Sequence, residues 1–497
     1  MRVSHLAGWL ILLWPAVDLA AGPDEQLAEA VRNGDTAVVR ALVAQGVDVT
    51  TPQGDGATAL HWAAYADDVE TADLLLRAGA RVNATNDLGV TPLWVACTNG
   101  SAEMVPRLLA AGANPNIAPA TGGTPLMRAV RTGNADAVES LLSAGADVNA
   151  SEGSRGQNAL MWAVTQHHAT VARLLIDRGA DLEARTSVSR QLVLTCCQEN
   201  NTDGNGSIWV EQGGFTPLLF AARLGDLDAA RLLLAAGAHV DVATPGGTTA
   251  LVVAAHSGHG ALAALLLENG ADPNAAGAGY TALHAAVLRD DPDLAEALLA
   301  YGANPNARLL RGTPARRGGA DFAFNKHWLG ATPLWLAAAF HKPALVRVLA
   351  ADGGDPLLPS SDGTTPLMAA AQGESPRALF QDASPVLPPG EERPTLEVLQ
   401  MLVELGADVT AVNAAGDTAL HRAASKRFDA VVRFLADHGA SLNARDEQGR
   451  TPLACAVRHC HVLSNTEGSF VEADFRALAG SGSNSTTALL RRLGATE

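Results

Sequence analysis

The chain has 497 residues, of which 47% are hydrophobic but only 4% aromatic, and its formal net charge is −17. Length alone would suggest roughly three ordinary globular domains. A composition rich in alanine, glycine and leucine instead favours closely stacked helices over a large sheet core. The negative charge excludes broad binding to nucleic acid or anionic lipid, which requires dense lysine and arginine, and it favours basic or neutral partners.

Residues 1–22 have the layout of a secretory signal peptide. Arg2 precedes an apolar run over residues 6–17, which Asp18 closes, and small residues follow at 20–22. The apolar run is shorter than the roughly 20 residues that a membrane-spanning helix needs. We therefore expect an exported protein, periplasmic or secreted, with no integral membrane segment in the mature chain. An uncleaved N-terminal anchor is the alternative.

A short phrase recurs along the rest of the chain, in which Thr or Asn is followed by Pro or Ala and then Leu. Seven of the ten steps between successive matches are 32 to 34 residues long, a period typical of stacked repeats. The matches begin at Thr58, Thr91, Thr124, Asn158, Thr216, Thr249, Thr281, Thr332, Thr365, Thr418 and Thr451.

Each repeat has the signals of two short helices. Its Thr offers an N-cap oxygen to a helix start, and Pro suits the first helical position. The pattern predicts a first helix such as residues 59–66 and a leucine-rich second helix such as residues 72–80. Gly79 then stands where a helix end needs a left-handed backbone. Segments such as residues 146–150 are expected to form extended turns that lead into the next repeat.

The full pattern, G-x-T-P-L-H-x-A-A…L-L-L-x-x-G-A-D-V-N-A, resembles the ankyrin repeat. His61, His284 and His421 keep the histidine of that family, and the phrases GADPNA and GADVNA keep its hairpin. The resemblance implies an all-α repeat solenoid of helix-turn-helix units with β-hairpin finger loops. It covers about residues 24–497 in twelve units, with a polar N-terminal cap at residues 24–49, so that a single solenoid over residues 23–497 follows the signal peptide.

Four insertions interrupt the repeats. By register, residues 186–213 and 309–329 fall in fingers, whereas residues 373–395 and 460–485 separate the two helices of a unit. The third insertion is proline-rich and is expected to be a solvated loop, with a polyproline ligand as the alternative.

In ankyrin-like proteins the fingers and the first helices form the concave face that binds partners. The second insertion would add a basic and aromatic patch there, containing Arg316, Arg317 and Trp328. The alternative is that its aromatic residues fold back onto the neighbouring repeat and its arginines are solvated. By register with the family, we expect Phe215 and Phe340 to be exposed, and Trp62 and Trp162 to be packing residues. The predicted partner-binding residues are Tyr65, Arg131, Phe215, Arg223, Tyr280, Arg289, Arg316, Arg317, Trp328, Phe340 and Lys426.

No motif of a nucleophilic hydrolase, zinc protease, phosphate-binding loop or dinucleotide fold is found. The histidines at 256 and 259, and the cysteines and histidines at 455–461, have ligand-like spacing, but both groups match the repeat pattern better than a metal site. The five cysteines do not form a disulfide framework. We expect no cofactor and no metal.

The predicted function is therefore a non-enzymatic scaffold, monomeric, that holds a protein partner of unknown identity. Binding would rest on complementarity between the partner and a rigid concave face with enlarged fingers. The alternative is an enzyme or thiol-redox site in the first insertion, around Cys196, Cys197 and Glu199. Those two cysteines are expected to be free thiols, with an oxidised pair or a bridge to another thiol as alternatives.

Overall fold

The computed structural model describes residues 23–120, 122–194, 207–312, 328–373, 392–458 and 485–496. The chain divides into two compact units, Met1–Ala180 and Asp181–Glu497, here called the N-terminal and C-terminal units. The expected single solenoid over residues 23–497 stays a prediction. Within the described ranges, no helix is long and apolar enough to cross a membrane.

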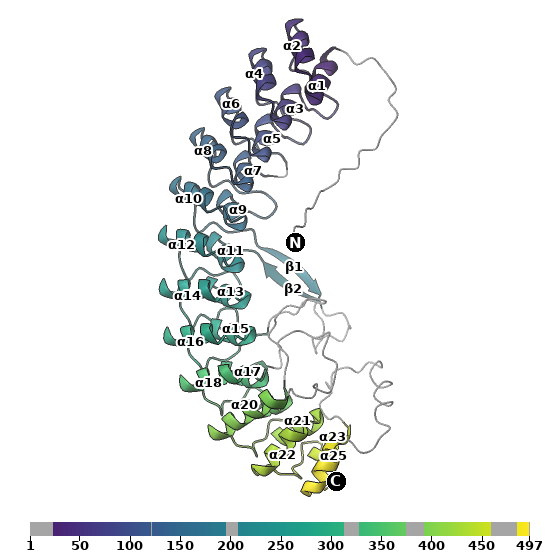
Figure 1. The fold of residues 1–497 in the computed structure, drawn as a ribbon, viewed down its shortest axis with the longest axis vertical. Coiled ribbons are helices and arrows are strands. Elements are labelled where there is room, and N and C mark those ends of the chain that lie inside the picture. The colour runs from purple at the N-terminus through teal and green to yellow at the C-terminus, as the bar shows by residue number, and fades with distance from the viewer. Residues whose placement is uncertain are drawn as a thin grey trace. The chain divides into compact units, whose positions relative to one another are not determined.

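The N-terminal unit consists of helices in stacked pairs (Figure 1). Odd-numbered helices contact the next odd-numbered helix, and even-numbered helices contact the next even-numbered one, so the unit has two helix rows. We call them the first-helix row and the second-helix row. The helices are α1 Pro23–Asn33, α2 Thr36–Ala44, α3 Ala59–Ala66, α4 Val69–Arg77, α5 Pro92–Asn99, α6 Met104–Ala110, α7 Pro125–Thr132, α8 Ala135–Ser143, α9 Ala159–Thr165 and α10 Ala169–Asp177.

The C-terminal unit repeats this two-row arrangement, so both units confirm a helical-repeat solenoid of the ankyrin type. It begins with an antiparallel ribbon that projects from the first-helix side (Figure 1). Its strands are β1 Ser189–Leu194 and β2 Ser207–Gln212. Its helices are α11 Pro217–Leu224, α12 Leu227–Ala235, α13 Ala250–Ser257, α14 Gly260–Glu268, α15 Ala282–Arg289, α16 Pro292–Ala300, α17 Pro333–Ala339, α18 Pro343–Ala351, α19 Pro366–Gln372, α20 Glu392–Glu404, α21 Ala419–Lys426, α22 Asp429–Asp437, α23 Pro452–Arg458 and α25 Ser485–Leu493.

The first helices begin as the sequence predicts. The Thr91 hydroxyl accepts a hydrogen bond from the backbone N–H of Trp94 at 3.2 Å, and Pro92 occupies the first helical position. Where the repeat has Asn158 instead, its side-chain oxygen accepts from the N–H of Met161 at 3.0 Å. Either side chain satisfies a backbone donor that would otherwise have no partner at the helix start.

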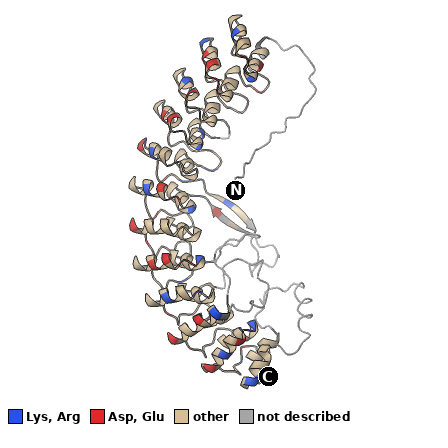
Figure 2. Cartoon of the chain, viewed as in Figure 1, with Lys and Arg blue, Asp and Glu red and all other residues tan. Residues whose placement is uncertain are grey.

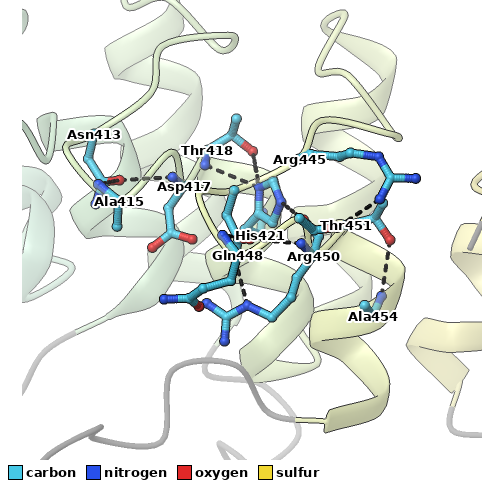
Figure 3. Close-up of polar contacts among 12 residues, drawn as sticks. Asn413, Ala415, Asp417, Thr418, His421, Arg445, Gln448, Arg450, Thr451 and Ala454 are labelled. Carbon is cyan, nitrogen blue, oxygen red and sulfur yellow. Dashed lines mark hydrogen bonds and ion pairs between the residues drawn. The ribbon is translucent and has the colours of Figure 1, made fainter.

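The family histidine ties each first helix to the next finger. His421 accepts the Thr418 N–H at Nδ1 (3.2 Å), so its proton is on Nε2, which donates to the Arg450 carbonyl at 3.1 Å (Figure 3). His61 and His284 make the same pair of contacts. In two repeats tryptophan replaces the histidine, and Trp94 Nε1 donates to the corresponding carbonyl, that of Gly123, at 2.8 Å.

Asparagines link successive fingers in a ladder. Asn116 donates through Nδ2 to the Gly145 carbonyl at 3.0 Å and accepts from the Asp147 N–H at 2.8 Å. Asn306 makes the same two bonds to Gly353 and Asp355, on the far side of the second insertion. The stack therefore continues across that insertion, whose extra residues do not separate the neighbouring repeats.

Two further details concern the insertions and the cysteines. The helix α20 begins at Glu392, so the last residues assigned to the third insertion are helical. Cys97 is a free, fully buried thiol. Cys455 is disulfide-bonded.

Replacing Asn116 by alanine removes both bonds of one ladder step. Because a hydrogen bond contributes about 1 kcal/mol net, we expect Asn116→Ala to lower the free energy of unfolding by about 1–2 kcal/mol in urea titrations. Gln45→Ala is the control, since Gln45 is an exposed amide and surface changes of this kind cost under about 0.5 kcal/mol. Equal values for the two variants would contradict a structural role for the ladder.

Burial lowers the pKa of His284 from its ordinary 6.5 to about 4, although hydrogen bonds to two carbonyls partly oppose the shift. The folded state thus binds fewer protons than the unfolded state between these values, and stability falls as pH drops from 6.5 towards 4. In His284→Leu, which copies Leu219 of another repeat, stability at pH 7.5 should fall by about 1–2 kcal/mol for the lost bonds.

The same variant no longer titrates at this position, so its deficit relative to the unmodified protein should shrink between pH 6.5 and pH 4. Urea titrations at several pH values measure that difference. A deficit that stayed constant over this pH range would show that the titration of His284 does not lower the stability of the folded protein there.

Candidate functional site

The two helix rows carry different charges. From α3 to α23, no first helix contains an aspartate or glutamate. Figure 2 shows most helical acidic residues on the second-helix row. The first helices instead carry the basic residues Arg128, Arg131, Arg223, Arg289, Arg422, Lys426 and Arg458. The first-helix row of the C-terminal unit is therefore basic, whereas in the N-terminal unit the basic residues lie on α7 and the first helix α1 is acidic.

In the N-terminal unit, arginines of the first-helix row lie over tryptophan rings. The guanidinium carbon of Arg128 lies 4.5 Å from the centre of the Trp94 ring, and that of Arg131 lies 5.0 Å from the centre of the Trp162 ring. Such cation–π contacts hold the guanidinium in a fixed orientation. Trp162 is half-buried, so it both packs in the stack, as predicted, and presents a ring face to Arg131.

These arginines line an open pocket of about 50 Å³ together with Gly123, Met127, Glu152 and Trp162. Glu152 is held within its own loop, where its carboxylate accepts from the Arg155 N–H at 3.0 Å and from the Ser154 hydroxyl. Burial, and then the charge of Arg131, lower the pKa of Arg128, and Glu152 opposes this. The pocket thus contains two positive charges and one carboxylate that already has local partners.

Several predicted contact residues are accessible. Tyr65 has 66% of its surface exposed, and Arg131 and Arg223 are also exposed. Phe215, which was expected to be exposed, is half-buried, and its ring centre lies 5.8 Å from the guanidinium carbon of Arg223. Arg289 is half-buried and donates to the Ser257 carbonyl at 3.3 Å.

In the C-terminal unit, three other predicted contact residues are buried: Phe340, Tyr280 and Trp328 are only 6%, 7% and 3% exposed. Lys426 is half-buried, so its side chain can still contact a partner. Trp328 packs edge-on against Phe340 with ring centres 5.1 Å apart. Both rings thereby leave water. Trp328 therefore behaves as in the alternative in which the aromatic residues of the second insertion fold back onto a repeat.

The expectation that Phe340 is exposed was therefore wrong, and Tyr280 and Trp328, which were predicted to bind a partner, are buried in the free protein. Tyr280 lies beside His256, and its burial raises the pKa of its hydroxyl to about 12. Arg316 and Arg317 lie outside the described residues, so their predicted role stays a prediction. A register position shows which way a residue points, whereas the neighbouring repeat decides how much of it is covered.

The ribbon in the first insertion presents residues that sequence analysis missed. Leu192 and Trp209 face each other across the two strands and are 53% and 66% exposed. The adjacent pair on the same face, Arg190 and Glu211, forms an ion pair at 3.6 Å. The segments SRQLVL and SIWVEQ contain Val, Ile and Trp, residue types that are enriched in strands, and lie on either side of a stretch with Gly, Asn and Asp. That signal could have identified the hairpin.

The base of the ribbon is fixed to the repeats. The Thr186 N–H donates to the Phe215 carbonyl at 3.0 Å, and the Gly214 N–H donates to the Thr186 carbonyl at 3.1 Å. Arg185 also donates to the Ala243 carbonyl of the next finger at 2.7 Å. These bonds anchor the ribbon at its root and keep the Leu192–Trp209 pair at a defined place on the C-terminal unit.

The two histidines with ligand-like spacing make contacts within the repeats. His259 Nε2 is 3.2 Å from the Arg223 carbonyl, and the His256 ring lies against Tyr280. Over the described ranges, no group of three or more potential ligand side chains could hold a metal ion. Cys196, Cys197 and Glu199, the residues of the alternative thiol site, lie outside those ranges, as do His459, Cys460 and His461.

Comparison with known proteins agrees with this architecture. A family model described as ankyrin repeats (3 copies) matches residues 27–119, 118–186, 188–277, 218–308 and 392–464. The chain is 29% identical over 236 residues to ankyrin repeat and SOCS box protein 16 of Mus musculus, covering 44% of this chain and 49% of that protein.

Two other relatives share shorter parts of their own length. Identity is 44% over 62 residues with Rabankyrin-5 of Homo sapiens, which is 12% of this chain and 5% of that protein. It is 30% over 260 residues with the E3 ubiquitin-protein ligase KEG of Arabidopsis thaliana, which is 50% of this chain and 14% of that protein.

The chain thus spans about half the length, or less, of the curated relatives that it matches, and their whole-protein activities are not carried over. The shared part is the repeats themselves, which act in protein–protein interaction. Because the family model matches more than half of the chain, this protein belongs to the ankyrin-repeat family.

Proposed function

We propose that this protein is a non-enzymatic scaffold that binds another protein through its first-helix rows and its ribbon. The observation that carries the proposal is the exposed Leu192–Trp209 pair on the ribbon. Large apolar side chains gain free energy when they leave water, at roughly 25 cal/mol per Å². An ordered tryptophan with 66% of its surface in water is therefore well placed to contribute to an interface.

The repeats supply a preorganised surface for such binding. The histidine, tryptophan and asparagine bonds fix each finger to the next, so a partner does not have to order the backbone on binding. Side chains on the first-helix rows, such as Tyr65, Arg131 and Arg223, then add specific contacts. Specificity in this proposal comes from side chains on a rigid frame.

We also infer that the protein is exported, to the periplasm or the outside of the cell. The support is the signal-peptide layout of residues 1–22 and the disulfide at Cys455, because structural disulfides persist in oxidising compartments. A partner in this proposal is a protein of the same compartment.

The ribbon can be tested by replacing Leu192 and Trp209 together with serine. Because both side chains are largely exposed, the melting temperature should change by less than about 2 °C, corresponding to a surface change of under about 0.5 kcal/mol. Capture of proteins from an exported fraction, quantified by mass spectrometry, should lose its main specific partner at least tenfold.

Gln191→Ser is the matched control, because Gln191 is an exposed polar residue on the opposite face of β1. It should leave capture unchanged. Undiminished capture by a stable Leu192→Ser/Trp209→Ser variant would remove the ribbon from the proposed interface.

Export can be tested by expressing the full chain in a bacterial host and measuring the mass of the protein in each fraction. The exported protein should lack about the first 22 residues, in agreement with a signal peptide. Leu10→Arg/Leu12→Arg, which interrupts the apolar run, should keep the full-length chain in the cytoplasm. A full-length chain that remained cytoplasmic without these changes would contradict the localisation proposal.

A further inference from the structure

We propose that the pocket at Arg128 and Arg131 binds an acidic side chain from an extended segment of the partner protein. The inference rests on the proposed scaffold function and names the chemistry that this part of the surface recognises. We call the four residues Trp94, Arg128, Arg131 and Trp162 the arginine–tryptophan site. All of them lie in the N-terminal unit, on α5, α7 and α9.

The first argument is the arrangement of charge. Arg128 and Arg131 are three residues apart on α7, so they lie on the same face of that helix. Like charges at this spacing repel each other. Within the described part of the chain, neither guanidinium makes an ion pair or a side-chain hydrogen bond. Glu152, which lines the same pocket and accepts hydrogen bonds within its own loop, offsets one of the two positive charges, and a ligand carboxylate would offset the other.

The second argument is orientation. Each guanidinium carbon lies over a tryptophan ring, Arg128 over Trp94 and Arg131 over Trp162, and a cation–π contact of this kind does not use the N–H groups as hydrogen-bond donors. A carboxylate has two oxygens that match this planar set of donors, which makes Arg–carboxylate pairs strong and specific. Gly123 leaves room for it, because a Cβ there would lie 3.4 Å from Arg128 Nη2.

The third argument is the surrounding field. The first helices α3, α5, α7 and α9 contain no acidic residue, whereas α4, α8 and α10 of the second-helix row do. An acidic segment is therefore attracted to α7 and repelled by α8, whose only charged residues are Asp136 and Glu139. The net charge of −17 favours basic or neutral partners for the chain as a whole. The separation of charges reverses that preference at the arginine–tryptophan site.

The test uses the full mature chain and two labelled twelve-residue peptides, one alternating Glu and Gly and the other alternating Gln and Gly. Fluorescence anisotropy at low salt should show at least tenfold tighter binding of the Glu peptide. Arg128→Gln/Arg131→Gln should weaken binding of the Glu peptide at least tenfold. Arg128→Lys/Arg131→Lys keeps the charge but loses the planar donors. This variant should therefore show more than half of the loss of Glu-peptide affinity that the glutamine variant shows.

The matched control is Arg77→Gln/Arg173→Gln, which removes two exposed arginines from α4 and α10 of the same unit. It should weaken binding of the Glu peptide less than twofold. An equal loss in this control would reduce the effect to net charge and overturn the site. Equal binding of the Gln peptide would overturn it too, as would tenfold tighter binding of a phosphoserine–glycine peptide, which would assign a phosphate ligand.

Melting temperatures establish that each variant is folded. If Arg128→Gln unfolds the protein, the lysine variant and the salt dependence of Glu-peptide binding still test the site, because an ionic contact weakens with salt. Capture from the exported fraction separates the two proposals. Loss of peptide binding with intact capture overturns only the acidic-ligand proposal. If the unmodified protein captures no specific protein from the exported fraction, the scaffold proposal is overturned, whereas the result of the peptide-binding experiment still holds.

Discussion

The structure depends on bonds that join each repeat to the next finger. First helices of seven or eight residues would be unstable alone, since isolated helices of this length are marginal in water. The donor from His421, or from Trp94 in another repeat, and the paired bonds of Asn116 fix neighbouring units at one spacing. At that spacing at least one leucine of each second helix is buried, such as Leu75, Leu108 and Leu141. Local sequence supplies the bonding groups, and the stack makes them effective.

Because stability comes from contacts between neighbours, the outer surface is free to vary. The inserted residues before Trp328 do not break the ladder between Asn306 and Asp355, and α11, which follows the ribbon, packs against α12 and α13. The absence of acidic residues from the first helices α3 to α23 is a further freedom of this kind, since charge there is not needed for packing. Surface chemistry and fold are therefore largely separate in this protein, as expected for repeat architectures.

The candidate site was predicted unevenly. Register placed Tyr65, Arg131 and Arg223 on the accessible side, and their exposure agrees with it. The same reasoning failed for Phe340, because the next aromatic residue in space, Trp328, comes from an insertion for which the repeat pattern gives no position. It also overlooked Trp209, whose exposure follows from a hairpin and not from the helical period.

By itself, the sequence determined the repeat unit, its helix starts, the sites of the insertions and the membership of the family. These follow from local signals, such as the Thr91 cap and the period of 33 residues, which do not depend on distant contacts. Only the tertiary structure decided which side chains are covered and which arginines meet which rings. Arg128 lies over Trp94 from the preceding repeat, a contact between residues 34 positions apart. Such pairings depend on the rise and rotation between units, which arise when neighbouring repeats pack.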